Sequence, residues 1–118
     1  MPATISPVSD MLVTVKSREV QRALFAESAG DREAARRHFL AAAHLELVLA
    51  HDYDEAGEPD LALRSRISAA SCLWSAGDIE QARQALERLQ AQYPAQTTAI
   101  AAVIAELTRD YPARGNKN

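Results

Sequence analysis

The sequence predicts an all-α fold of five helices, arranged as two antiparallel helical hairpins and a C-terminal capping helix. Three observations predict it. The segment Ser-Ala-Gly-Asp occurs at residues 28–31 and again at 75–78, each time between two stretches with helical periodicity. The chain is 47% hydrophobic but only 5% aromatic and uses Ala heavily, which favours closely packed helices over strands. Apolar residues recur at helical spacing along most of its 118 residues, which is the length of one domain.

The repeated tetrapeptide has the chemistry of a turn between two helices. Gly30 and Gly77 can adopt the left-handed conformation that closes a helix without a Cβ penalty. Asp31 and Asp78 follow them, where an N-cap carboxylate accepts a backbone N–H of the next helix. In the second copy Gln81 completes the spacing of a capping box. We therefore expect a helical hairpin at each copy.

The first helix is predicted to begin at Ser9, which can act as its N-cap, and to end at Ala29. Residues 1–8 contain two prolines and little to bury, so we expect a flexible arm there. The segment 11–15 by itself would also suit a strand, because it is rich in β-branched residues. The helical period continues through Leu24, however, and favours a helix.

The second helix is predicted to begin after Asp31 and to end near His51, so that the first hairpin covers residues 9–51. Apolar residues on two of its faces predict contacts on two sides, as in an inner helix of a stacked array. Residues 52–60 follow as an acidic stretch interrupted by Gly and Pro, which we interpret as a loop.

The second hairpin is expected over residues 59–93. Its first helix starts at Pro59, a residue that suits the first helical turn, and ends at Ala76. Its second helix covers residues 79–92 and stops before Pro94, because the residue that precedes a proline is disfavoured in the α conformation.

The capping helix is predicted over residues 95–109. A single apolar stripe with i, i+3, i+4, i+7 spacing marks it: Ile100, Val103, Ile104 and Leu107. One-sided amphipathicity suits the terminal helix of an array. The domain then covers residues 9–110, and a flexible polar tail is expected over 111–118.

Beyond the tetrapeptide, residues 16–107 resemble two tetratricopeptide repeats (TPRs). The first copy matches the TPR pattern at Ala23, Gly30, Ala35, Phe39 and Ala42. The second copy matches at Ala70, Gly77, Ala82, Leu86 and Pro94. The copies are 47 residues apart, from Ser28 to Ser75, whereas TPRs repeat about every 34. The usual Trp, Leu and Tyr of the first TPR helix are also missing. Another array of α-hairpins, such as a HEAT-like pair, is therefore an alternative.

The resemblance implies an interaction module, because TPR domains bind peptides or helices in a groove lined by the first helix of each pair. Carried over by position, that groove would contain Val20, Gln21, Leu24, Glu27, Arg64, Ile67, Ser71 and Trp74. Its apolar centre predicts a partner helix, a peptide or a second copy of this chain, in which case the protein is a homo-oligomer. Alternatively, its apolar residues simply pack together or against the capping helix.

Metal binding has little support in the sequence. The acidic segment 52–60 resembles part of a calcium loop, but Ala56 and Leu63 stand where two of the ligands are required. The three histidines lie on one predicted helix with separations of six and seven residues rather than the four of a helical zinc site: His38, His44 and His51. We expect no metal and no other cofactor.

Nucleic-acid binding is the alternative function. Six basic residues could form a patch on the first hairpin: Lys16, Arg18, Arg22, Arg32, Arg36 and Arg37. Acidic residues are interspersed among them, however, and no aromatic platform accompanies them. The net charge of −3 also indicates no general affinity for nucleic acids or membranes.

Enzymatic activity is not expected. No Ser or Cys has a His at a motif spacing, and no Gly-rich loop precedes a helix, so we predict no small-molecule substrate. The single cysteine, Cys72, has no intramolecular disulfide partner and is interpreted as a small buried hydrophobe. We expect a cytoplasmic protein, because no signal peptide is recognisable and no segment reaches about 18 consecutive apolar residues.

Overall fold

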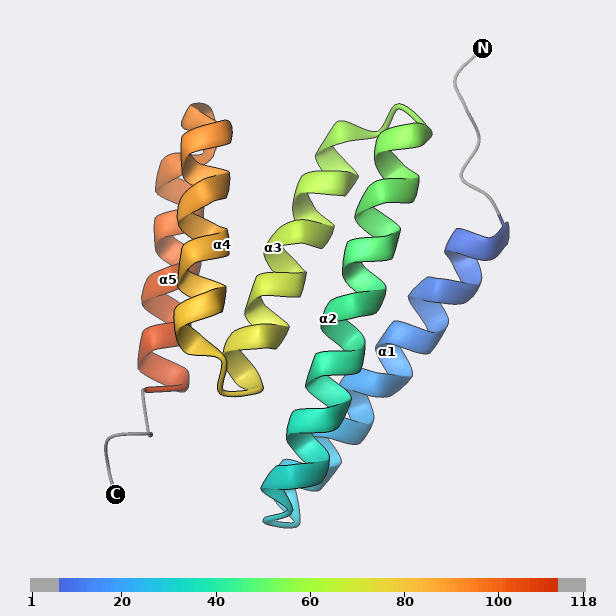
Figure 1. Cartoon of the computed structure of the whole chain (residues 1–118), viewed down its shortest axis with the longest axis vertical. Helices are drawn as coiled ribbons and strands as arrows, with labels where there is room; N and C mark the ends of the chain where they lie inside the picture. The colour runs from blue at the N-terminus through green and yellow to red at the C-terminus, as the bar shows by residue number, and fades with distance from the viewer. Residues whose placement is uncertain (1–6, 113–118) are drawn as a thin grey trace.

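Five α-helices follow one another along residues 7–112, the part of the chain that this computed structural model describes (Figure 1). They are α1 (Pro7–Ser28), α2 (Arg32–Glu55), α3 (Pro59–Ser75), α4 (Ile79–Gln92) and α5 (Thr97–Asp110), with a 3-10 turn at Pro94–Gln96. The predicted all-α fold of five helices is confirmed, and the described residues contain no strand.

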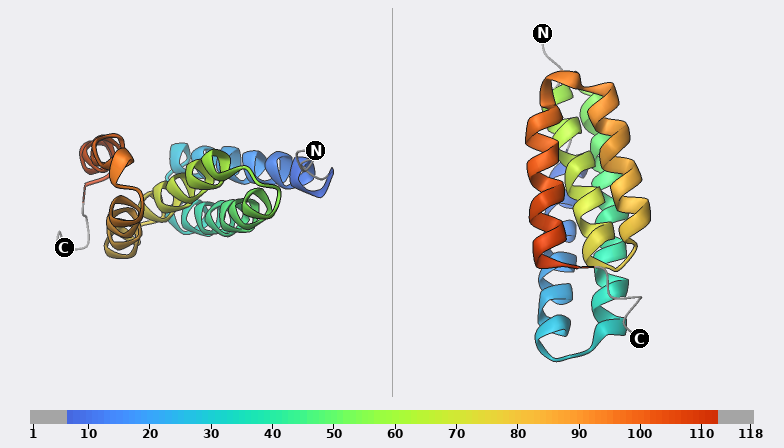
Figure 2. Two further views of the ribbon diagram at one scale, coloured as in Figure 1. Left: turned by 90° about the horizontal axis from the view of Figure 1, so that it is seen from above. Right: turned by 90° about the vertical axis from the view of Figure 1, so that its left-hand side faces the viewer.

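Consecutive helices lie antiparallel and side by side, in a slab with principal extents of 54 × 31 × 16 Å (Figures 1 and 2). Each helix contacts the next one along the chain, and α5 also contacts α3. α1 lies at one edge of the slab, where α2 is the only described helix with Cα atoms within 8 Å of it. A slab this thin has a small interior, so the helices at its edges keep much of their surface exposed.

The three turns that join α1 to α2, α2 to α3 and α3 to α4 share one backbone conformation, the Schellman motif of helix C-termini. In each turn a glycine has a positive φ, which L-residues with a Cβ rarely adopt: 77° at Gly30, 75° at Gly57 and 99° at Gly77. The next residue donates its N–H to the carbonyl five positions earlier: Asp31 to Ala26 at 2.8 Å, Glu58 to Tyr53 at 2.8 Å and Asp78 to Leu73 at 3.0 Å. A third turn, at residues 56–58, therefore has the same conformation as the two predicted turns. It also has the same Ala-Gly-acidic sequence.

The acidic segment 52–60 is not the loop that its composition predicts. α2 continues to Glu55, four residues beyond the expected end, and α3 begins at Pro59, as predicted. Carboxylates near a helix C-terminus are unfavourable with the helix dipole, but tertiary partners offset this effect here. Asp52 accepts a hydrogen bond from Ser9 at 3.0 Å, and Asp54 lies 2.6 Å from the guanidinium of Arg66.

The N-terminal prediction for α1 was also wrong in detail. The helix already includes Pro7 and Val8, so Ser9 lies inside it and is not its N-cap. Ser9 is buried, with 2% of its surface exposed, and its hydroxyl donates to Asp52 instead. The remainder of the predicted arm, residues 1–6, lies outside the described residues.

The two repeated aspartates have different roles. Asp31 accepts the backbone N–H of Ala34 at 3.1 Å, which confirms the predicted N-cap. Asp78 makes no capping hydrogen bond with its side chain, so the predicted capping box is absent. Its carboxylate binds the guanidinium of Arg36 at 2.8 Å, and this group also donates to the carbonyl of Ala76 at 3.0 Å. A charged partner from α2 replaces the local cap and joins the two hairpins.

The larger apolar core lies between α3, α4 and α5 and surrounds Trp74. Its buried members are Ala70, Trp74, Ala82, Leu86, Leu89, Ile100 and Leu107. The indole N–H of Trp74 donates to the carbonyl of Tyr111 at 2.8 Å, so the chain just after α5 closes this core. Tyr111 therefore does not belong to a flexible tail, and residues 113–118 of that predicted tail lie outside the described residues.

The smaller core lies where the first hairpin meets the end of α3. It consists of Ala23, Ala35, Phe39 and Ala76, with Ala26 and Leu40 packed against it. Small side chains dominate it, so α1 and α2 approach closely but bury little apolar surface in this cluster.

Candidate protein-binding surfaces

A cleft lies between α1 and α3, the two helices that the TPR resemblance assigns to a partner groove. α2 forms its floor, and a cavity of 420 Å³ opens along it. Val13 of α1, Leu49 of α2 and Ile67 of α3 line this cavity together with Arg64. Arg64 and Ile67, two of the predicted groove residues on α3, therefore both line this cleft.

The other predicted groove residues vary in exposure. Gln21 and Leu24 are exposed on α1, whereas Val20 on α1 and Ser71 on α3 are half-buried. The hydroxyl of Ser71 donates to the carbonyl of Ile67 in its own helix at 3.1 Å. These residues do not form the continuous apolar centre that the groove prediction requires.

Trp74 is a core residue, which corrects its assignment to the groove. Only 1% of its surface is exposed, and the guanidinium of Arg83 covers its ring at 5.0 Å from the centroid. The hydrogen bond to the carbonyl of Tyr111, which directly follows α5, also fixes the position of the indole. Since α4, α5 and Tyr111 all enclose it, Trp74 presents almost no surface to a partner protein.

A second hollow, of 1220 Å³, lies at the end of the slab where the α1–α2 turn faces the α3–α4 turn. Glu27, another predicted groove residue, lines this hollow rather than the α1–α3 cleft. Its wall carries charges of both signs, among them Arg32, Glu33, Glu80 and Asp110. Such a mixed wall indicates no particular ligand.

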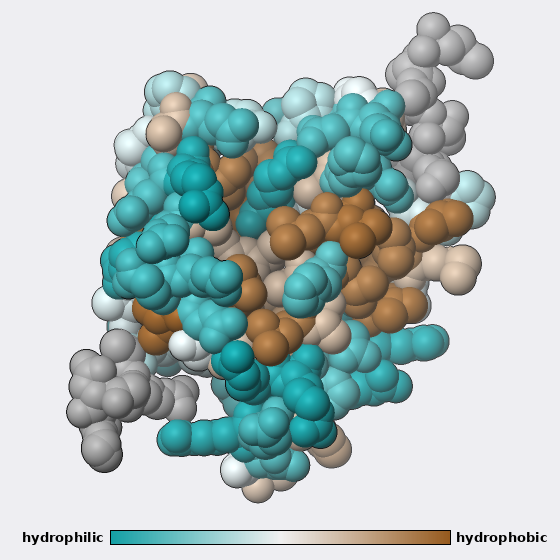
Figure 3. All heavy atoms as spheres, viewed as in Figure 1, coloured by the Kyte–Doolittle hydropathy of each residue, from teal (hydrophilic) through white to brown (hydrophobic). Residues whose placement is uncertain are grey.

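The surface that the sequence prediction missed is apolar and belongs to the first hairpin. Among the described residues, every large hydrophobic side chain that is exposed lies on α1 or α2: Val8, Met11, Val13, Val15, Leu24, Phe25, Leu47 and Val48. Their exposed fractions range from 37% at Val13 to 82% at Phe25. Figure 3 shows hydrophobic atoms gathered over the upper parts of α1 and α2. The i, i+3, i+7 spacing of Val8, Met11 and Val15 was the available signal, because it places them on one stripe of a helix.

Polar pairs hold α1 against α2. Besides the Ser9–Asp52 hydrogen bond, the ammonium of Lys16 lies 3.3 Å from the carboxylate of Glu46, a residue with only 4% of its surface exposed. A carboxylate this deeply buried requires such a partner. The face of α1 that packs against α2 thus includes a Ser, a Lys and a Glu, while several of its large apolar residues face away.

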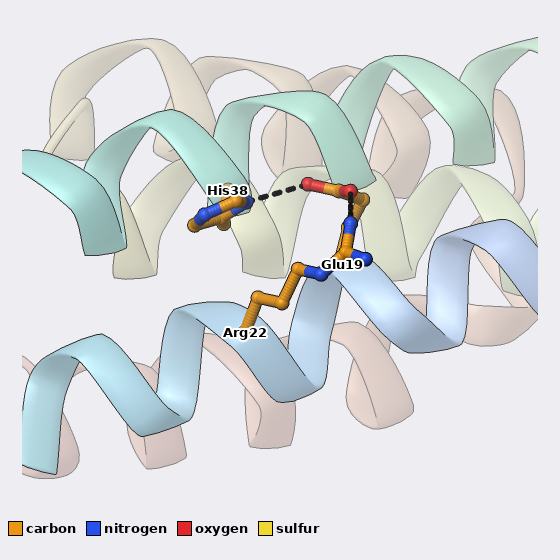
Figure 4. A network of polar contacts seen from close by, with 3 residues as sticks. All are labelled: Glu19, Arg22 and His38. Atoms are coloured by element: carbon orange, nitrogen blue, oxygen red, sulfur yellow. Dashed lines mark hydrogen bonds and ion pairs between the residues drawn. The ribbon is translucent and has the colours of Figure 1, made fainter.

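A third polar pair lies further along the same contact (Figure 4). The imidazole Nδ1 of His38 lies 2.7 Å from Glu19, and Arg22 donates to the same carboxylate at 3.0 Å. The hydrogen bond with His38 is the largest cause that lowers the pKa of Glu19 below its ordinary value. Glu19 therefore joins α1 to α2 as a carboxylate.

These pairs fix the register of the two helices. Ser9 lies opposite Asp52, and Lys16 lies opposite Glu46, so the segment 8–15 of α1 is level with the segment 46–52 of α2. Four exposed apolar residues at this level are called the outer apolar surface: Val8, Met11 and Val15 of α1 with Val48 of α2. Leu47 lies instead on the stripe of α2 that carries Arg36 and Asp54, whose partners belong to α3 and the α3–α4 turn.

The basic residues of the first hairpin are largely engaged with carboxylates. Four of them lie within 4.0 Å of one: Lys16 with Glu46, Arg22 with Glu19, Arg36 with Asp78 and Arg37 with Glu33. The predicted patch therefore alternates in sign rather than presenting a continuous positive surface.

The histidines and the cysteine are not gathered into a site. His51 pairs with Glu55 at 3.5 Å, and Nδ1 of His44 lies 2.9 Å from the carbonyl of Leu40. Within residues 7–112, no group of three or more His, Cys, Asp or Glu side chains is placed to hold a metal ion. Burial raises the pKa of the Cys72 thiol to about 11, so this group is protonated at neutral pH and a poor nucleophile.

Comparison of this chain with protein-family models, with curated proteins and with solved structures gives no match. Among the described helices, none combines the length and the apolar character that crossing a bilayer requires.

Proposed function

We propose that this protein is a non-enzymatic interaction module with a TPR-like architecture, which binds another protein or a second copy of itself. One observation carries the proposal: all exposed large hydrophobic side chains of the described chain lie on the first hairpin. Contiguous apolar surface on a small protein is typical of a protein-binding site. The proposal includes the cytoplasmic location that the sequence predicts.

Two surfaces of the first hairpin are available to a partner. The α1–α3 cleft lies between the two helices that the TPR resemblance assigns to a peptide groove, and Val13 exposes apolar surface along α1 there. The outer apolar surface presents more exposed hydrophobic side chains, including Met11 at 65% and Val48 at 50%. The greater exposed apolar area makes the outer apolar surface the stronger candidate.

Nucleic-acid binding through the first hairpin has less support. Binding to phosphates depends on basic side chains that are free to replace counterions. Here four basic residues are already paired with carboxylates within 4.0 Å.

A photo-crosslinking amino acid tests the proposal in cells that produce the protein. We expect a probe at Val48 to form discrete adducts with protein, because this side chain is half-exposed on the outer apolar surface. The matched control is the same probe at Glu87, an exposed position on α4. Equal adducts at both positions, or adducts that a nuclease removes, would contradict the proposal.

A further inference from the structure

We propose that the α1–α3 cleft binds an acidic segment of a partner protein, in which an apolar side chain lies close to a carboxylate. This inference rests on the proposed function, because it states which kind of sequence one of the two surfaces binds. The outer apolar surface consists of hydrophobic side chains alone, whereas the cleft combines apolar walls with polar groups that select a ligand.

The cleft separates two helices that do not pack on each other. Among the described elements, α1 and α3 share no pair of Cα atoms within 8 Å, so only α2 connects them. The cavity of 420 Å³ along this gap is open rather than enclosed, and it lies near the lower end of the roughly 300–1,000 Å³ of ligand sites. Small molecules usually have about 70–90% of their surface buried in such sites. An open cleft therefore suits a peptide, whose other side stays in solvent.

Apolar side chains from three helices line the cavity. Leu49 forms its floor with 1% of its surface exposed, and Val13 borders it from α1 with 37% exposed. Leu61 and Ile67 line it from α3, and both are half-buried. An apolar side chain of a partner would cover the surface that these residues still expose, which is favourable in proportion to the area buried.

One charged group of the cleft is free to bind a ligand. Lys16 and Glu46 both line the cavity, but they lie 3.3 Å apart and neutralise each other. Arg64, the third charged residue of the lining, is exposed, and no described carboxylate lies within 4.0 Å of its guanidinium. Arg66 on the same helix is paired, by contrast, with Asp54 at 2.6 Å. The cleft therefore carries one uncompensated positive charge, and a carboxylate is the complementary group of a protein partner.

Ser65 gives a second, independent indication of a ligand. It lines the cavity with only 7% of its surface exposed, and its hydroxyl has no hydrogen-bond partner among the described residues. Within residues 7–112 no fully buried side-chain oxygen or nitrogen lacks a partner, so the exposed fraction of Ser65 includes this hydroxyl. Ser71 on the same helix donates to the carbonyl of Ile67 instead. A partner segment that hydrogen-bonds to Ser65 would offset the cost of leaving its hydroxyl unbonded.

The polar groups and the apolar wall of α3 lie on one stripe. Leu61 and Ser68 both line the cavity and are seven residues apart, or about 10 Å along the helix axis. Arg64 and Ser65 lie between them at the i+3 and i+4 positions. The apolar side chain and the carboxylate of a partner must therefore lie within about 10 Å of each other, as close neighbours in its sequence do.

A library of short random peptides, displayed on phage and selected with the full chain, tests the proposal. We expect the selected peptides to contain Asp or Glu close to Leu, Ile or Phe. Arg64→Glu should raise their Kd roughly tenfold or more in fluorescence anisotropy, because an attractive contact becomes repulsive. The variant should retain the helical circular dichroism of the wild type, since Arg64 is exposed. Arg88→Glu, the same change at an exposed position on α4, should leave the Kd unchanged.

Two further measurements separate the charge from the hydroxyl. A selected peptide with Lys in place of its carboxylate should bind Arg64→Glu more tightly than it binds the wild type, because the signs are then exchanged. Ser65→Ala should raise the Kd of the original peptide about fivefold without lowering stability to urea, because the hydroxyl has no described partner in the free protein. A Kd that neither Arg64→Glu nor Ser65→Ala changes would overturn the cleft as the binding site.

A selection that enriches no acidic and apolar sequence would also overturn the proposal. So would decanoate, an apolar carboxylate without a peptide backbone, if it binds as tightly as the selected peptides. If either result is found while the probe at Val48 still forms specific protein adducts, the proposed function survives and only the assignment of the cleft is wrong. If the library selects nothing and that probe forms no specific adduct, both proposals fail.

Discussion

The two halves of this molecule differ in where their large apolar residues lie. In the second half, α3, α4 and α5 enclose an apolar core around Trp74, and none of the large hydrophobic side chains on these three helices is exposed. In the first half, α1 packs on α2 through Ser9, Lys16 and Glu19, and large apolar residues face outward. The second half therefore has the distribution expected of a folded unit, whereas the first half has an apolar exterior that a partner would cover.

The helices at the two edges of the slab, α1 and α5, are held by different kinds of contact. Apolar burial is non-directional and scales with area, so it stabilises α5 without fixing detailed contacts. Hydrogen-bonded pairs contribute less net stability but specify one geometry. α1 is held in a specific register by such pairs, and this register places Val8, Met11 and Val15 level with Val48 of α2.

The largest effect is expected from opening the apolar core. Trp74→Ala should lower the free energy of unfolding by about 3–5 kcal/mol, because it leaves a cavity and removes the hydrogen bond to Tyr111. Urea unfolding followed by circular dichroism measures it, with Trp74→Phe as the variant that keeps most of the volume. A loss below about 1 kcal/mol would show that the second half does not depend on this core.

Breaking the buried pair of the first half should have the next largest effect. Lys16→Met leaves the carboxylate of Glu46 buried without its ammonium partner, and we expect a loss of about 2 kcal/mol, since Lys16 is itself partly exposed. Adding Glu46→Leu removes the stranded charge and should recover most of the loss. Urea unfolding of both single variants and the double variant measures the coupling. Simple additivity would contradict a polar contact between α1 and α2.

The Glu19–His38 contact makes the first half sensitive to acid. The pKa of Glu19 is lowered on folding, so its unfolded state binds a proton more tightly and stability rises with pH. The contribution should be fully present above the ordinary pKa of 4.5 and be lost as the pH falls through the folded value. Comparing the urea unfolding of the wild type and Glu19→Gln across this range measures it. The matched control is Glu87→Gln on α4, the same substitution at an exposed position of the second half.

The smallest effect is expected at the most exposed apolar residue. Phe25 on α1 is 82% exposed, so Phe25→Ala should change the free energy of unfolding by no more than about 0.5 kcal/mol. A large loss, measured in the same unfolding assay, would mean that Phe25 packs against something in solution. This result would break the comparison, because the first half would then bury a large aromatic side chain, as the second half buries Trp74.

Most of the secondary structure could be predicted from the sequence, because its signals are local. Gly30 and Gly77 close their helices as expected, and Asp31 caps the next one. The third turn at Gly57 could have been recognised too, since Ala-Gly-acidic occurs there as well. Ser9 and Asp78 were misassigned because their partners, Asp52 and Arg36, are more than 40 residues away in the sequence.

The candidate site was less predictable than the fold. The resemblance placed Arg64 and Ile67 beside a cleft, but it also placed Trp74 there. Nothing near Trp74 in the sequence shows that Tyr111 accepts its indole N–H or that Arg83 covers its ring. The outer apolar surface was not predicted, because helical periodicity shows which residues share a stripe but not whether another helix covers it.

The sequence by itself determined the five helices and the turns at Gly30 and Gly77, since helical periodicity and Gly-based caps act over a few residues. The tertiary structure decided which apolar faces are buried. Trp74 and Met11 both lie on apolar stripes of helices, yet one is enclosed by α4 and α5 and the other faces outward. Burial depends on which helices meet, and buried polar partners such as Lys16 and Glu46 decide that between α1 and α2.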